Sequence, residues 1–173
     1  VEGAVAAVTR ALLDGAAVRL VADPAWPLPA LPPRVRADAP ADAHRLLVTD
    51  RLVPLDGRTA VLRPPSLVVG VGGSRGVPAG QVHDLLDRGL DAAGLSPASV
   101  RCLASADIKA DEAGIRATAD ALGVPLVTHP AADLAAVDVP HPSEVVRAAV
   151  GTPSVAEAAA LLGEPGRRPD AAL

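Results

Sequence analysis

The sequence lacks most of the large side chains that usually fill a protein interior. Its 173 residues include no Phe, Tyr or Met and only one Trp, although 50% of them are hydrophobic. Ala, Val and Leu must therefore build the core, which packs through many small contacts. At this length the chain can bury one ordinary core or two small ones, as expected of a soluble globular protein.

Other absences narrow the function. The single cysteine, Cys102, excludes an internal disulfide and, in an apolar segment, favours a packing role in a reducing cytoplasm. No run reaches the ~18 to 20 apolar residues of a membrane helix. The net charge of −4 argues against nucleic-acid binding, which needs a basic face. The four histidines have no zinc-type spacing, so no metal site is expected.

The first part of the chain reads as a small α/β unit over residues 1–65. Apolar residues at helical spacing predict a helix over 2–14, and strands are expected at 16–22 and 46–48. Asp56-Gly57 predicts the turn of a hairpin within 53–65. The proline-rich stretch 23–40 between the first two strands excludes a regular helix or central strand there.

The second part alternates strands with helices, which predicts a mainly parallel sheet flanked by helices in three layers. We expect this domain to cover residues 66–163, with 164–173 as a tail or linker. The expected strands are 67–71, 100–104 and 124–127, and the expected helices are 78–93, one around Ile115 to Leu122, 143–150 and 154–162. Ligands collect at the carboxyl ends of such strands, so the segments 70–76, 105–112 and 128–143 are the candidates for a binding site.

The segment LVVGVGGSRGVP, residues 67–78, is the most distinctive part of the sequence. Its glycines are spaced one residue wider than in the dinucleotide fingerprint, and it lacks the Gly-Lys-Ser/Thr ending of a phosphate-binding loop. Small residues let a ligand approach the backbone, and Arg75 would favour an anion. The alternative is a tight strand-to-helix turn with a solvated arginine.

The segment SADIKADE, residues 105–112, carries more polar groups than a simple connection needs. Lys109 is a candidate partner for a substrate carboxylate, and Asp107 or Glu112 for accepting a proton from water. The alternative for Glu112 is that it only begins the next helix, where acids favour the helix dipole. Further along, Ser154 and Glu157 have the spacing of a capping box, whose first role is structural.

Three ordered motifs resemble one known family. VGVGGSRGVP, LASADIKADEAGI and PSEVVRAAVGTPSVAEAAALL are similar to the carboxy-terminal domain of the cobalamin-biosynthesis protein CbiG, a fold shared with CobE. The resemblance is strong over about 67–162 and weaker over 1–65, which is similar to the central region of CbiG proteins. The matching positions are Gly70, Gly72, Arg75, Gly76, Ser105, Lys109, Glu112, Pro142, Ser143, Gly151, Ser154 and Glu157.

The resemblance implies a role in making the corrin ring. CbiG proteins hydrolyse cobalt-precorrin-5A, opening a lactone and releasing acetaldehyde, and the cobalt arrives inside the substrate rather than as a cofactor. On this basis the expected catalytic acids are Asp107 and Glu112. The expected substrate-binding residues are Gly70, Gly72, Ser74, Arg75, Gly76, Ser105, Lys109, Ser143, Thr152 and Ser154.

The sequence departs from the family at several points. Many members have Cys or Ala where this chain has Gly73, so a thiol there is not required. Members also usually continue past the last helix into another strand, and full-length CbiG has a further amino-terminal domain. The alternative is therefore a non-catalytic corrinoid-binding or carrier domain like CobE, with a precorrin methyltransferase as a candidate partner or fusion.

Overall fold

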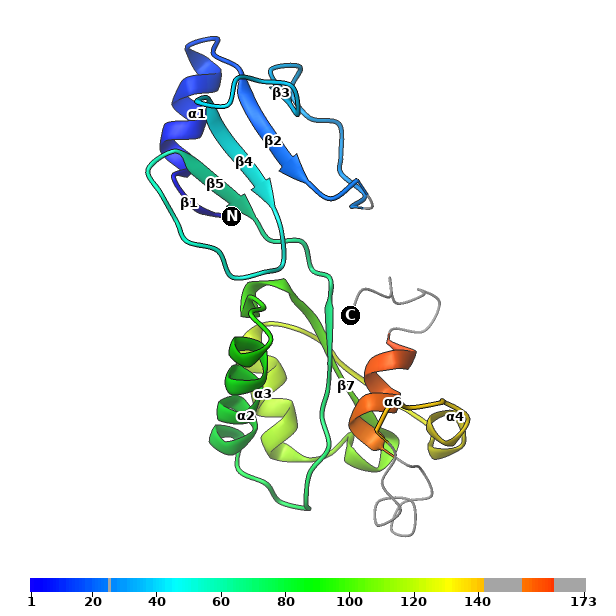
Figure 1. The fold of residues 1–173 in the computed structure, drawn as a ribbon. Helices are drawn as coiled ribbons and strands as arrows, with labels where there is room; N and C mark the ends of the chain where they lie inside the picture. Colours follow the sequence, from blue (N-terminus) through cyan, green and yellow to red (C-terminus); the bar gives the residue numbers. More distant parts are fainter. Residues whose placement is uncertain (25, 142–153, 164–173) are drawn as a thin grey trace. The chain divides into compact units, whose positions relative to one another are not determined.

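The computed structural model describes residues 1–24, 26–141 and 154–163, and it divides into two compact units (Figure 1). The first unit comprises Val1–Pro64 and Gly94–Ala98, and the second comprises Pro65–Ala93 and Ser99–Leu173. The sequence did not indicate that the short segment 94–98 groups with the first unit. No helix in the described part of the chain is long and apolar enough to cross a bilayer.

The first unit is a five-stranded sheet with one helix packed on it. Its elements are β1 (Glu2–Gly3), α1 (Val5–Leu13), β2 (Val18–Ala22), β3 (Val35–Arg36), β4 (His44–Val48) and β5 (Thr59–Leu62). The strand order is β1-β5-β4-β2-β3, and only the β1–β5 pair is antiparallel. Val8 and Ala11 of α1 pack on Val18, Val35 and Ala60 of the sheet.

Two predictions for this unit were wrong in detail. The first helix starts at Val5 rather than at residue 2, because Glu2 and Gly3 pair with β5 as a short strand. The expected hairpin within 53–65 does not form, because residues 52–56 make no strand and β5 pairs with β4 and β1 instead. Asp56 does make a turn there, since its carboxylate accepts a hydrogen bond from the backbone N–H of Arg58 at 2.9 Å.

The second unit has the predicted alternation of strands and helices. Its elements are β6 (Leu67–Gly70), α2 (Ala79–Ala92), the 3-10 turns η1 (Pro97–Ser99, which begins in the first unit) and η2 (Asp107–Lys109), β7 (Val100–Ala106), α3 (Ala113–Leu122), β8 (Leu126–His129), α4 (Ala131–Ala135) and α6 (Val155–Leu162). The strands are parallel in the order β6-β7-β8. The short helix α4 was not predicted, and the expected helix over 143–150 lies outside the described residues.

Helices cover both faces of this sheet, as the three-layer prediction requires. The two crossovers β6–α2–β7 and β7–α3–β8 move in the same direction, so right-handed connections place α2 and α3 on the same face. The later helices α4 and α6 cover the opposite face (Figure 1). There, buried Ala104 and Ala106 of β7 pack with Leu134, Ala158 and Ala159.

The approach of α6 to β6 is unusually close. A Cβ atom on Gly70 would lie 1.8 Å from the carbonyl oxygen of Ala156. No side chain fits in that space, so only glycine lets the first turn of α6 pack on the end of β6. Alanines at positions 158 and 159 continue the same close contact along the helix.

Replacing Gly70 should therefore destabilise the second unit. We expect Gly70→Ala to lower the free energy of unfolding by roughly 1 to 3 kcal/mol or more, because α6 has to move away from the sheet. Gly89→Ala is the matched control: this glycine lies in α2 with nothing within 4 Å of an added Cβ. It should stabilise the chain by up to ~1 kcal/mol, because alanine is the better helix former. Chemical denaturation of both variants measures the difference, and equal effects would contradict the packing argument.

Candidate functional site

The carboxyl ends of the three parallel strands bring the predicted segments to one edge of the second unit. β6 ends at Gly70, β7 at Ala106 and β8 at His129. The glycine loop, defined here as residues 71–78, leaves β6 at this edge, and η2 follows β7 directly. Two of the three predicted segments are therefore neighbours.

The first end of the glycine loop is fixed by β7. The Ser105 hydroxyl donates a hydrogen bond to the carbonyl oxygen of Val71 at 2.7 Å, and the Val71 N–H donates to the carbonyl oxygen of Ala104 at 2.8 Å. Ser105 is completely buried. Its side chain thus supports the loop from beneath, and in this arrangement it does not reach the surface where a ligand would bind.

The second end of the loop is fixed by Glu112. Gly76 has a φ of 73°, a conformation that favours glycine, and its N–H donates a hydrogen bond to Oε2 of Glu112 at 2.8 Å. The ammonium group of Lys109 lies 3.1 Å from Oε1 of the same carboxylate. The side chains of Lys109 and Glu112 are only 17% and 11% exposed. Both carboxylate oxygens are thus already engaged within the domain.

These contacts change the acid–base character of Glu112. Its pKa is lowered, chiefly because the Gly76 N–H donates a hydrogen bond to the charged form and then because Lys109 does the same. Partial burial opposes this effect, while the positive charges of Lys109 and Arg75 add to the lowering of the pKa. A carboxylate with a lowered pKa is a weaker base, so Glu112 is a poorer general base for taking a proton from water.

The middle of the loop is open to solvent. Gly72, Gly73, Ser74 and Arg75 are all exposed. A Cβ atom on Gly72 would lie 3.8 Å from the Cβ of Ala156, so the first turn of α6 lies beside the loop. Ser154 caps this helix, accepting a 3.4 Å hydrogen bond from the N–H of Glu157 as the capping-box spacing predicted.

The other predicted site residues lie in different settings. Asp107 is exposed at the start of η2, and its side chain makes no hydrogen bond or ion pair to the described residues. Gly70 faces α6 rather than solvent. Ser143 and Thr152, with Pro142 and Gly151, lie outside the described residues.

Two histidines near this edge were not identified as site residues from the sequence. Nδ1 of His141 lies 2.9 Å from Oε1 of Glu157, and the His141 N–H donates a hydrogen bond to Oε2 at 3.1 Å, which joins the segment after α4 to α6. His129 is buried at the end of β8, and its Nε2 has no hydrogen-bond partner among the described residues. The sequence signal for His129 was its place in the segment 128–143, which follows an expected strand. Nowhere in residues 1–24, 26–141 and 154–163 do three His, Cys, Asp or Glu side chains gather as metal ligands would.

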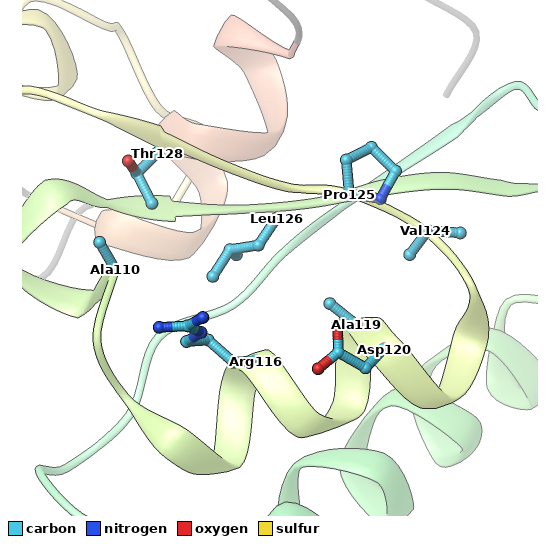
Figure 2. A pocket seen from close by; sticks show the side chains of 8 residues that line it. All are labelled: Ala110, Arg116, Ala119, Asp120, Val124, Pro125, Leu126 and Thr128. Atoms are coloured by element: carbon cyan, nitrogen blue, oxygen red, sulfur yellow. The ribbon is translucent and has the colours of Figure 1, made fainter.

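A pocket of about 300 Å³ lies between α3 and β8 (Figure 2). Arg116 and Asp120 of α3 line it together with Leu126 and Thr128 of β8. It touches the segment after β7 only at Ala110 and includes no residue of the glycine loop. The pocket therefore reaches the carboxyl edge of the sheet at Ala110 and Thr128 but does not include the glycine loop.

Comparison with known proteins identifies the family. The family model described as "Cobalamin synthesis G C-terminus" matches residues 67–171, which is more than half of the chain. The chain belongs to this family. The match begins at β6 and includes the glycine loop and η2, so two of the three motifs that suggested the resemblance lie at the loop edge.

Individual relatives agree with this assignment. The chain is 42% identical over 99 residues to protein CobE of a Sinorhizobium species, covering 56% of this chain and 64% of CobE. It is 30% identical over 100 residues to cobalt-precorrin-5A hydrolase of Priestia megaterium, covering 58% of this chain and 27% of that enzyme. A crystal structure of CobE, from the cobalamin biosynthetic pathway, matches with a TM-score of 0.53 at 40% identity over 55% of this chain and 71% of that one. The two sequence matches span less than two thirds of the relatives' own length, 64% of CobE and 27% of the hydrolase.

Two buried serines, Ser99 just before β7 and Ser105 within it, allow a test of the loop support. We expect Ser105→Ala to lower the free energy of unfolding by about 1 kcal/mol, because it removes a hydrogen bond that is made in the folded chain. Ser99 is equally buried, but its hydroxyl has no partner among the described residues. Ser99→Ala should therefore be neutral or stabilising. Urea denaturation of both variants measures the contrast, and an equal loss for Ser99→Ala would show that burial alone decides.

Proposed function

We propose that this chain acts in corrin-ring biosynthesis and binds a cobalt-precorrin or related corrinoid intermediate at the loop edge. The observation that carries the proposal is the open stretch of the glycine loop: four exposed residues including Arg75, with both ends of the loop fixed. Corrinoid intermediates carry many carboxylates around a macrocycle. An arginine on a small-residue loop suits a carboxylate, because the guanidinium donates two parallel hydrogen bonds.

Within that function, we propose the domain as a component of a cobalt-precorrin-5A hydrolase. The reaction adds water to the carbonyl of the ring lactone and breaks the acyl–oxygen bond, and the two-carbon fragment that bears this oxygen then separates from the macrocycle as acetaldehyde. Asp107 is the preferred candidate for activating the water, because it is exposed beside the loop and has no partner within the described residues. Glu112 is the weaker candidate, because its lowered pKa reflects two donors that it already holds.

The second candidate function is a non-catalytic, CobE-like corrinoid carrier. The 42% identity to CobE favours it, since the hydrolase relative is matched at 30% and over a smaller share of its length. A precorrin methyltransferase remains a proposed partner. Binding requires Arg75 and Lys109, whereas hydrolysis also requires a free base such as Asp107.

One incubation distinguishes the two functions. If the hydrolase proposal holds, the chain mixed with cobalt-precorrin-5A should release acetaldehyde, and Asp107→Asn should abolish the release without preventing binding. Binding without acetaldehyde would favour the carrier. The absence of both binding and release, in a folded chain supplied with its neighbouring domains, would exclude both functions.

The role of Arg75 can be tested without turnover. We expect Arg75→Ala to raise the Kd for cobalt-precorrin-5A by about tenfold or more, because a charge-assisted hydrogen bond contributes roughly 1.5 to 3 kcal/mol. Arg88→Ala is the control: it removes the same charge from the exposed face of α2, away from the loop. Both variants should keep the melting temperature of the parent chain. Equal losses of affinity would mean that only net charge matters, and unfolding of Arg75→Ala would indicate a structural role for this arginine.

A further inference from the structure

The second half of the glycine loop rests on the first two turns of α3. The Gly76 N–H donates to Glu112, the residue that begins the helix. A Cβ atom on Gly114 would lie 2.0 Å from the carbonyl oxygen of Val77, so the backbones touch there. The Thr118 hydroxyl lies 3.3 Å from the carbonyl oxygen of Ala79, where α2 begins.

These contacts differ in chemistry. The contacts at Gly114 and Thr118 are made by a backbone and a hydroxyl, which do not titrate near neutral pH. Of Glu112, Gly114 and Thr118, only Glu112, the N-cap of α3, carries a charge, and it also holds Lys109 from η2. Its carboxylate therefore joins the two segments that the proposed function assigns to the ligand.

We propose that Glu112 is a positioning residue: it binds the Gly76 N–H and the Lys109 ammonium group together and so keeps residues 72–75 and Lys109 arranged to receive the ligand. This inference rests on the proposed function for its ligand. It deepens that proposal, because it assigns to one of the two predicted acids a role other than proton transfer. The catalytic role, where there is one, then belongs to Asp107.

The arrangement also has a competing interpretation. The Glu112 carboxylate occupies a backbone N–H and an ammonium group, which are the same kinds of donor that a ligand carboxylate would use. If Glu112 blocked the site instead of arranging it, removing the carboxylate would tighten ligand binding. The two interpretations thus predict opposite changes of Kd.

The first measurement needs no ligand. In the full chain, amide hydrogen exchange at Gly76 should become roughly tenfold faster in Glu112→Ala, because a hydrogen bond to a charged acceptor is lost. Glu112→Gln should show a smaller increase, since its amide oxygen still accepts one hydrogen bond. The control is Asp111→Asn, which removes the neighbouring charge: Asp111 is fully exposed and lies 3.8 Å from Arg116. Unchanged exchange at Gly76 in Glu112→Ala would overturn the proposal.

The second measurement is the Kd for cobalt-precorrin-5A as a function of pH. At neutral pH, Glu112→Gln should bind about tenfold more weakly than the parent chain and Asp111→Asn should bind normally. The charged groups that act on Glu112 are Lys109 of η2 and Arg75 of the loop. As pH falls through the lowered pKa of Glu112, the parent chain itself gains the proton. The Kd ratio of the two proteins should therefore fall towards one in acid.

The outcomes separate this inference from the proposed function. Tighter binding by Glu112→Gln, or a ratio independent of pH, would overturn the positioning role. If the parent chain does not bind the corrinoid at all, the proposed function fails, but exchange at Gly76 still decides whether Glu112 holds the loop. Glu112→Gln has nearly the shape of the native side chain, so it decides the question by itself if Glu112→Ala does not fold.

Discussion

The close packing of α6 on β6 and β7 is the constraint on which the loop edge depends. Because α2 and α3 both lie on one face, the three-stranded sheet would leave its other face uncovered without the helices that follow β8. The space at Gly70 and the alanines of α6 let this helix approach within backbone contact. That approach places the first turn of α6 beside Gly72. Small residues at these positions therefore allow the helix to lie beside the loop.

The glycines of the 67–78 segment divide into different roles. Gly70 belongs to the packing of α6, and Gly76 adopts a positive φ that presents its N–H to Glu112. Gly72 and Gly73 lie in the exposed stretch between the two fixed ends. One motif therefore combines helix packing, loop support and an open surface. This division explains why the spacing of the glycines resembles that of a nucleotide-binding loop without following its pattern.

The sequence predicted the second unit well, because strand and helix periods alternate there and three parallel strands leave few topologies. The first unit was predicted less well: Asp56-Gly57 signals a turn, but the partner of β5 is chosen by long-range pairing with β4 that no local pattern encodes. At the candidate site, the order of strands and loops placed Lys109 and Glu112 at the carboxyl edge of the sheet. It did not show that Glu112 faces Gly76, because that contact joins residues 36 positions apart.

The acids of the loop edge determine which function the domain can perform with its own groups. Holding a carboxylate-rich macrocycle requires positive groups and an accessible backbone, and Arg75 with the exposed glycines supplies both. Opening a lactone further requires a base to activate water and donors for the oxygen that becomes negative. Glu112 has both oxygens engaged, so within the described residues of η2 and the glycine loop the base would have to be Asp107. Binding thus rests on several groups and hydrolysis on one exposed carboxylate, which makes binding the more firmly supported half of the proposed function.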